Sequence, residues 1–312
     1  MNWKIKATVQ KALAVTRVGD CLNHIPATLS KKYHYNVALY QVHECIRRFN
    51  YCAIDLSKNK TALEIGTGYS LLSSVVLSLL GFQKVITVDI TKDLRFGPFK
   101  RQILHLDNPE NLAKIVDASI YSEKEIRKKI ETIKQQNSLK AVQDLLGISY
   151  IAPYSFEMIE ARADKFNYIT SLVVLEHVPP ETLDTLFAKT KKWLAKDGFC
   201  VHTINFIDHF ANPGIFQDKN ISEFNFLRFS DKCWDYWSAN TIAYTNRLSY
   251  QYYLELCGKH ALNVVDFFGE NYRVRKELDL NLIHYDILKK YQSIPQKQDL
   301  VKFQRGTLII KA

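Results

Sequence analysis

A glycine turn between two apolar segments constrains the fold of this chain more than any other feature. Residues 61–70 read TALEIGTGYS, and their apolar positions are typical of a short buried strand in a parallel sheet. Gly66 and Gly68 allow the backbone to turn sharply and to approach a ligand closely, because neither carries a Cβ atom. The apolar run 71–80 predicts a helix packed on that sheet, and Gly81 is its expected end.

An acidic residue closes the next predicted strand. Residues 84–90 read KVITVDI, and Asp89 lies about 20 residues beyond Gly68. In a strand–turn–helix–strand unit, a carboxylate at this distance meets the hydroxyls of a bound ribose. The layout therefore predicts a site for an adenosine-containing cofactor.

The surrounding residues favour S-adenosylmethionine over a dinucleotide. A dinucleotide site has a third glycine and a helix N-terminus directed at the pyrophosphate, whereas Leu71 occupies that position here. Glu64 would be poorly placed beside a pyrophosphate, but it suits a cofactor that carries a sulfonium and an ammonium group. A two-glycine turn alone also fits an ordinary βα connection, so the prediction depends on Glu64 and Asp89.

Alternating strand and helix patterns predict an α/β fold with a mostly parallel sheet and helices on both faces. Pro180 opens a predicted helix over residues 180–193, and Asp197 and Gly198 are expected to form a turn. We expect a helical cap over residues 1–56 and a main domain over 57–312. That domain contains a helical insertion at 99–147 and an aromatic-rich insertion at 205–260. Ala62, Leu63 and Ile65 belong to the first expected strand, and the other expected strands are 84–90, 148–151, 166–171, 199–204, 262–268 and 307–311.

The composition is that of a globular protein, with 47% hydrophobic and 24% charged residues among 312. No segment approaches the about 20 apolar residues of a membrane span, and the N-terminus lacks a secretory pattern. Six cysteines without a CxxC pair predict reduced thiols and a cytoplasmic location. We expect no stable membrane insertion and no structural zinc.

The net charge of +10 is compatible with an acidic substrate or with ordinary surface charge. Lysines and arginines in residues 123–134 alternate with glutamates, as on a solvated helix face. Because no one-signed patch interleaved with aromatic residues is evident, the sequence argues against nucleic acid as a partner. It leaves the oligomeric state open, with a homodimer as one option.

Three motifs resemble the class I S-adenosylmethionine-dependent methyltransferases: LEIGTG (63–68), VITVDI (85–90) and the segment 166–202 with its L-E-H-V turn. The resemblance covers residues 57–92 and 148–203 well and the C-terminal hairpin loosely. It implies a Rossmann-like, doubly wound fold whose seven-stranded, mostly parallel sheet has an antiparallel last strand.

The resemblance also implies roles for individual residues. His177 would lie in the cleft beside the sulfonium. The family often has an aspartate at the end of the third strand that contacts adenine, whereas this chain reads YIAPYSFEM there, with Tyr154 or Ser155 in its place. The implied cofactor-binding residues are Glu64, Gly66, Thr67, Gly68, Tyr69, Asp89, Ile90, Leu175 and Glu176.

Methyl transfer is an in-line displacement, and it needs a base only when the acceptor carries a weakly acidic proton. His177 is one candidate, although the same position often forms part of the cofactor wall. Asp208 and His209 follow the fifth strand and form a second candidate, with hydrogen bonds within the loop as the alternative. His202 with Asp208 and His209 would also suit a metal site, as in catechol-type methyltransferases. We assign no metal from the sequence.

The function expected from the sequence is methylation of a small molecule, at oxygen rather than nitrogen, as in bacterial enzymes of natural-product biosynthesis. The insertion 205–260 resembles their variable acceptor region, but its aromatic residues also suit a core of their own. Arg228, Asn246 and Arg247 would contact an anionic or sugar-like acceptor, or bridge loops. The alternatives are an RNA or protein methyltransferase, a noncatalytic cofactor-fold binding subunit, and a nicotinamide-dependent enzyme.

Overall fold

The computed structural model divides into two compact units. Unit 1 contains Met1–Ile25, Val173–Phe187 and Thr203–Leu308, and unit 2 contains the remainder of the chain. Cys21, part of the predicted N-terminal cap and part of the insertion 205–260 lie outside the described residues. The structure describes residues 1–14, 30–163, 165–211, 217–238, 240, 244–272, 276–291 and 296–312.

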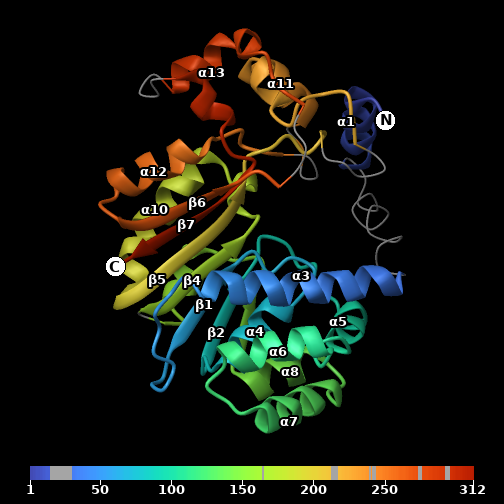
Figure 1. Cartoon of the computed structure of the whole chain (residues 1–312), viewed down its shortest axis with the longest axis vertical. Coiled ribbons are helices and arrows are strands. Elements are labelled where there is room, and N and C mark those ends of the chain that lie inside the picture. Colours follow the sequence, from blue (N-terminus) through green and yellow to red (C-terminus); the bar gives the residue numbers. More distant parts are fainter. Residues whose placement is uncertain are drawn as a thin grey trace. The chain divides into compact units, whose positions relative to one another are not determined.

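A seven-stranded sheet in the order β3-β2-β1-β4-β5-β7-β6 confirms the predicted fold class (Figure 1). β1 is parallel to both β2 and β4, and β2 is parallel to β3. Between β5 and β7, the Phe206 N–H donates to Gln304 and the Ala312 N–H donates to Gly198, so these strands are antiparallel. The strands are β1 (Thr61–Ile65), β2 (Lys84–Val88), β3 (Ile148–Ile151), β4 (Phe166–Leu172), β5 (Leu194–Asn205), β6 (Asn263–Glu270) and β7 (Arg305–Lys311).

Strand β5 starts earlier than the sequence predicted, and the expected turn at Asp197 and Gly198 is wrong. Both residues belong to the strand, which begins at Leu194. A Cβ atom on Gly198 would lie 2.8 Å from the carbonyl oxygen of Phe166. The glycine is therefore required by close backbone approach within the sheet rather than by a change of chain direction.

Unit 2 packs its helices around an apolar core. Helix α4 is buried along its whole length. It starts at Leu72, one residue later than the start of the predicted run 71–80, and Gly81 caps its C-terminal end. The stretch 99–147 is divided among several helices, of which α7 begins with a capping box formed by Ser122 and Glu125. The helices that begin in this unit are α3 (Lys31–Phe49), α4 (Leu72–Leu80), α5 (Phe96–Ile103), α6 (Pro109–Ala118), α7 (Glu123–Lys134), α8 (Leu139–Leu146) and α9 (Phe156–Glu160).

Unit 1 contains short helices joined by loops. Helix α10 (Pro180–Trp193) begins in this unit at the predicted proline, a residue favoured at the first helical position. No helix in the described part of the chain is both long and apolar enough to cross a membrane. The other helices here are α1 (Trp3–Ala14), η1 (Leu175–His177), η2 (Asn225–Arg228), α11 (Asp231–Ser238), α12 (Tyr250–Lys259), η3 (Leu280–Leu282), α13 (Tyr285–Lys290) and η4 (Lys297–Val301).

Aromatic rings build the core of unit 1. The ring of Trp3 in α1 lies 5.4 to 5.9 Å, centroid to centroid, from Phe210, Phe229, Trp234 and Trp237. Trp234 is 1% exposed. Aromatic residues of the 205–260 insertion thus form a core together with the N-terminal helix.

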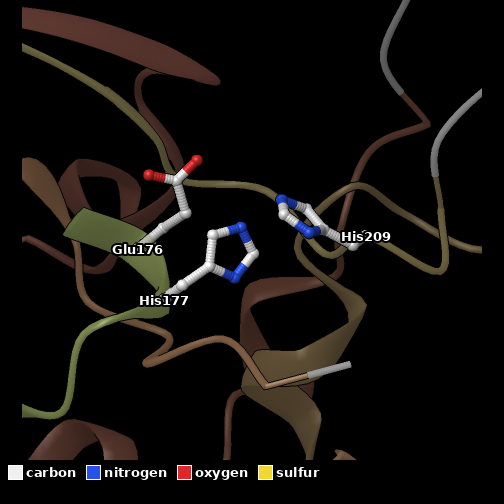
Figure 2. A group of neighbouring side chains, drawn as sticks. All are labelled: Glu176, His177 and His209. Atoms are coloured by element: carbon white, nitrogen blue, oxygen red, sulfur yellow. The ribbon is translucent and has the colours of Figure 1, made fainter. Parts of the chain in front are cut away.

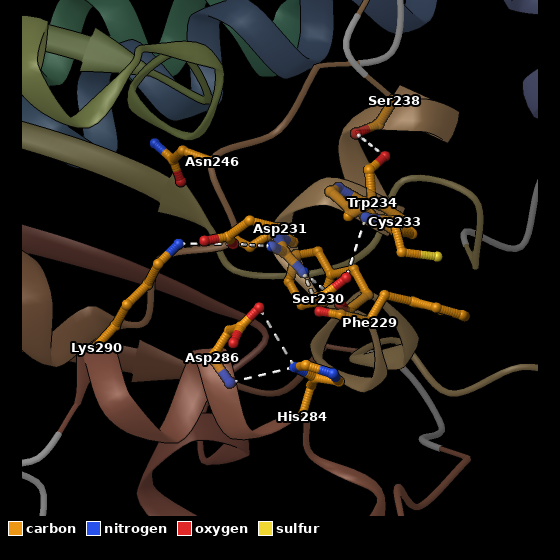
Figure 3. A network of polar contacts seen from close by, with 12 residues as sticks. Phe229, Ser230, Asp231, Cys233, Trp234, Ser238, Asn246, His284, Asp286 and Lys290 are labelled. Carbon is orange, nitrogen blue, oxygen red and sulfur yellow. Dashed lines mark hydrogen bonds and ion pairs between the residues drawn. The ribbon is translucent and has the colours of Figure 1, made fainter.

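Polar contacts fix the loops around this aromatic core (Figure 3). The Asp231 carboxylate accepts hydrogen bonds from Lys290, at 2.7 Å, and from Arg247. Arg247 is buried and also donates to the backbone carbonyls of Phe226 and Phe229, at 2.9 Å each. Arg247 therefore bridges loops, one of the two roles that the sequence left open.

Candidate functional site

The predicted glycine turn lies in unit 2 between β1 and α4. The Gly66 N–H donates to the carbonyl of Val88 at 2.8 Å, and the Gly68 N–H donates to the Asp89 carboxylate at 2.7 Å. Gly68 has a left-handed backbone with φ of +59°, and a Cβ atom added there would meet no atom within 4 Å. The turn thus presents open backbone, as a closely approaching ligand requires.

Asp89 follows β2 and is partly exposed. Its backbone is fixed on both sides, since its N–H donates to Ile151 and its carbonyl accepts from the Tyr154 N–H, each at 3.1 Å. Gly68 contacts one carboxylate oxygen, and the Thr91 N–H contacts the other at 3.3 Å. Each carboxylate oxygen can accept more than one hydrogen bond, so both retain capacity for ribose hydroxyls.

Two tyrosines flank this carboxylate. Burial, followed by the negative charge of Asp89, raises the pKa of both Tyr150 and Tyr154. The Ser155 hydroxyl caps α9 by accepting from the Met158 N–H, and the adenine contact through Tyr154 or Ser155 stays a prediction. Tyr150 was not predicted, because a tyrosine inside a short strand carries no distinctive sequence signal.

Glu64 is buried in unit 2. Its carboxylate accepts hydrogen bonds from the hydroxyls of Ser74 in α4 and Thr87 in β2, the latter at 3.0 Å. Burial raises its pKa, while these hydroxyls and the charge of Arg48 lower it in part. The described contacts of Glu64 are therefore with the protein, and its predicted interaction with the cofactor stays a prediction.

The remaining residues predicted around the turn differ in exposure. Thr67 is buried, with its hydroxyl 2.6 Å from the Thr87 hydroxyl. Tyr69 is 40% exposed and Ile90 is 73% exposed. Tyr69 and Ile90 are accessible to a ligand, whereas the Thr67 side chain supports the turn from inside.

The L-E-H-V turn lies in unit 1, where Asn246 holds it in place. The Asn246 side chain donates to the carbonyls of Leu175, at 2.7 Å, and Val178, at 2.9 Å. Its backbone N–H donates to the carbonyl of Glu176 at 2.8 Å. Asn246 therefore positions the segment that carries Glu176 and His177.

The same unit brings Glu176, His177 and His209 together (Figure 2). One ligand atom from each lies within 4.8 Å of the other two, and the histidine rings are 5.0 Å apart between centroids. The His177 Nδ1–H donates to the Tyr244 carbonyl at 2.8 Å, because a carbonyl oxygen can only accept. Neutral His177 therefore carries its lone pair on Nε2, and burial lowers its pKa.

Glu176 is 3% exposed, and neither carboxylate oxygen has a hydrogen-bond partner among the described residues. Burial raises the pKa of Glu176 to about 8, and the nearby backbone N–H groups and Arg305 guanidinium offset only part of this effect. The predicted cofactor-wall residue Leu175 is fully buried.

Asp208 is fully buried, and burial raises its pKa to about 7. Its carboxylate accepts from the Phe210 N–H at 2.8 Å and from the Asn225 side chain at 3.4 Å. These are the loop contacts that the sequence offered as an alternative to catalysis. His202 is also fully buried, in unit 2, with Nδ1 2.7 Å from the Ser171 hydroxyl.

Comparison with known proteins agrees with this geometry. Residues 37–247, more than half of the chain, match the family model described as "Methyltransferase domain". No curated protein matches the chain. A methyltransferase fold with a glycine turn and an acidic residue after β2 is thus present.

Solved structures that match this chain share little sequence with it. An S-adenosylmethionine-dependent methyltransferase from Mesorhizobium loti is 10% identical, with a TM-score of 0.42, over 83% of this chain and 94% of that one. Geranyl diphosphate C-methyltransferase from Streptomyces coelicolor is 11% identical, with a TM-score of 0.42, over 86% and 78%. Haemonchus contortus phosphoethanolamine N-methyltransferase 2 is 15% identical, with a TM-score of 0.43, over 86% and 52%.

The match to the family model decides the assignment. The chain belongs to the methyltransferase domain family, as an S-adenosylmethionine-dependent methyltransferase of class I. Its cofactor is S-adenosylmethionine, whose ribose is compatible with the partly exposed carboxylate of Asp89 and the open backbone at Gly68.

Proposed function

We propose that this protein transfers a methyl group to a hydroxyl oxygen of a small-molecule acceptor. The backbone at Gly66 and Gly68 would hold the methionine part of S-adenosylmethionine, Asp89 would bind the ribose, and Tyr154 would contact the adenine. When bound, S-adenosylmethionine would supply a methyl group on a cationic sulfonium, and its bond between sulfur and the methyl carbon would break as the acceptor oxygen bonds to that carbon. The leaving group is the neutral thioether of S-adenosylhomocysteine.

The protein residues in this proposal position the acceptor and remove its proton. His177 is the preferred base, because its Nδ1–H is fixed by Tyr244 and its Nε2 is available to accept a proton. Burial lowers the pKa of His177, which keeps the ring neutral and able to accept at neutral pH. His209, with its ring 5.0 Å from His177, would receive or share that proton.

The pair of histidines is the single observation that carries the preference for oxygen. A hydroxyl acceptor is a weak nucleophile until its proton begins to leave, so it benefits from a positioned base at neutral pH, whereas the neutral form of an amine already has a nucleophilic lone pair. The aromatic residues of 205–260 are largely occupied with their own core, so they favour no particular acceptor.

The test is a transfer assay with radiolabelled S-adenosylmethionine and matched pairs of small molecules that differ only in a hydroxyl or an amino group. We expect the hydroxyl compounds to be methylated. We expect His177→Ala to lower kcat by about 10²-fold or more, the typical contribution of a general base. His43→Gln, at a histidine whose side chain is 51% exposed, is the matched control and should retain activity.

Other outcomes identify the alternatives. Transfer only to amines would contradict the preference for oxygen, and transfer only to RNA or protein would contradict a small-molecule acceptor. Binding of S-adenosylhomocysteine without transfer to any acceptor class would favour the noncatalytic binding subunit.

A further inference from the structure

The protein satisfies the buried carboxylate of Glu176 only weakly, through the nearby backbone N–H groups of Glu176 and Asn205 and the charge of Arg305. Glu176 is 3% exposed, and both of its oxygens lack a hydrogen-bond partner in the described part of the chain. A buried carboxylate without a partner is costly, and native proteins pair such groups with hydrogen-bond donors or with cations. Glu176 therefore has the chemistry of a ligand for a positively charged group.

The neighbours of Glu176 are the right type for a metal ion. Two imidazoles, from His177 and His209, offer nitrogen atoms within 4.8 Å of a Glu176 oxygen and of each other (Figure 2). Two histidines and one glutamate form a well-known ligand set for Zn²⁺, and imidazole ligands favour transition metals over Mg²⁺ or Ca²⁺. All three residues belong to unit 1.

The surroundings orient these ligands. A metal-bound histidine commonly donates its second ring N–H to a carbonyl, which fixes the tautomer, and His177 donates from Nδ1 to the Tyr244 carbonyl. The backbone of Glu176 is held by the Asn246 N–H, and the carbonyl of His209 accepts from the Lys6 ammonium at 3.2 Å. Each of the three residues thus has a contact that fixes its backbone or its ring.

We propose that Glu176, His177 and His209 bind one divalent transition-metal ion, of the Zn²⁺ or Co²⁺ type. In a tetrahedral site with bonds of about 2.1 Å, ligand atoms lie about 3.4 Å apart, so binding would draw these side chains together by at most about 1.4 Å. The site revises the sequence-based expectation of no metal.

Two nearby cations oppose metal binding. The Arg305 guanidinium lies near Glu176, and the Lys6 ammonium contacts the His209 carbonyl. These charges disfavour weakly held ions such as Mg²⁺, so the expected ion is one that binds imidazole strongly. Three protein ligands would leave a coordination position open, as in catalytic rather than structural zinc sites.

Metal binding does not depend on the identity of the acceptor. The His177 Nε2 lone pair can hold either an ion or a proton, so His177 would not act as the base in the metal-bound chain. If the acceptor is the hydroxyl of the proposed function, the bound ion would activate it instead. The hydroxyl would bind the open position through its oxygen, and its proton would pass to solvent.

The test is titration of the full chain with Co²⁺, after chelator treatment and dialysis, followed by visible absorption. We expect one Co²⁺ per chain with the spectrum of imidazole and carboxylate ligation, displaced by Zn²⁺. Glu176→Gln, His177→Ala and His209→Ala should each weaken binding by about 10-fold or more. His43→Gln should bind as the unmodified chain does.

Circular dichroism shows whether each of the three ligand variants folds. If one of them does not fold, the Co²⁺ affinities of the other two decide the outcome. The proposal is overturned by the lack of stoichiometric Co²⁺, by unchanged affinity in the folded variants, or by equal loss in His43→Gln. Calorimetric binding of S-adenosylhomocysteine to the metal-free chain is measured separately, so that failure of the metal site is distinguished from failure of the proposed function.

Discussion

At the scale of single residues, the buried His202 makes folding sensitive to acid. Burial, assisted by the charge of Arg48, lowers the pKa of His202 from 6.5 to about 3. Between these values the unfolded chain binds a proton that the folded chain does not. The His202 contribution to the free energy of unfolding therefore falls by about 1.4 kcal/mol for each pH unit of acidification in this window.

Replacement of His202 removes this dependence. We expect the free energy of unfolding of His202→Gln, measured by urea titration from pH 7 to pH 4, to fall less steeply on acidification than that of the unmodified chain. The two slopes of the free energy of unfolding against pH should differ by about 1.4 kcal/mol per pH unit, which corresponds to one proton. Parallel curves for the two proteins would show that His202 does not retain its neutral form in the folded state.

Asp89 provides a second residue-scale prediction. Asp89→Asn keeps the size of the side chain but removes the charge that accepts from Gly68 and would accept from the ribose. Hydrogen bonds to a charged group contribute about 1.5–3 kcal/mol, so S-adenosylhomocysteine should bind about 10- to 100-fold more weakly in calorimetry. Asp93→Asn makes the same charge change nearby and should bind normally. Equal weakening in both variants would indicate a general charge effect.

The residue-scale features differ in how far the sequence predicted them. The link between Gly68 and Asp89 follows from a spacing within one βα unit, where local geometry fixes the distance. For Asn246 the sequence offered loop bridging as one of two roles, but its partner Leu175 could not be predicted, because the contact spans 71 residues of chain. The set of Glu176, His177 and His209 also depends on tertiary contacts. Of the three, only Glu176 and His177 lie in one sequence motif, the L-E-H-V turn.

At the scale of elements, an unfavourable residue follows the end of helix α12. Ala261 adopts a positive φ of 49°, a left-handed conformation that costs about 1–2 kcal/mol for a residue with a Cβ atom. Glycine is the usual residue in this position after a helix. Ala261→Gly should therefore raise the free energy of unfolding by about 0.5–1 kcal/mol in denaturant titration.

The same substitution inside a helix serves as the control. Ala113 is an exposed residue within α6, and Ala113→Gly should lower the free energy of unfolding by about 1 kcal/mol. Opposite signs for the two substitutions would support the left-handed C-terminus. Destabilisation by both would contradict it.

The elements themselves were predicted well where apolar patterns are bounded by clear turn residues. β3 and α10 have their predicted bounds, because glycine or proline marks at least one end of each. β5 was predicted too short, because an Asp-Gly pair normally indicates a turn, and only the approach of Phe166 explains the glycine within a strand. The long helical stretch was predicted, but its division into α5 to α8 was not.

At the scale of the whole molecule, cofactor binding should stabilise the folded chain. A ligand at 100 times its dissociation constant adds about 2.7 kcal/mol to the free energy of unfolding. S-adenosylhomocysteine should therefore raise the Tm by several degrees in scanning calorimetry, whereas NAD at the same concentration should not. A larger shift with NAD would favour the nicotinamide-dependent alternative.

The order of the strands also has a consequence for synthesis on the ribosome. β6 is the outer strand beside β7, and β7 is translated about 35 residues after β6 is complete. At about 5–20 residues per second, β6 waits a few seconds before its neighbour in the sheet emerges. During that interval its backbone edge is open to pairing with other nascent chains, a route to aggregation that chaperones holding this segment would block.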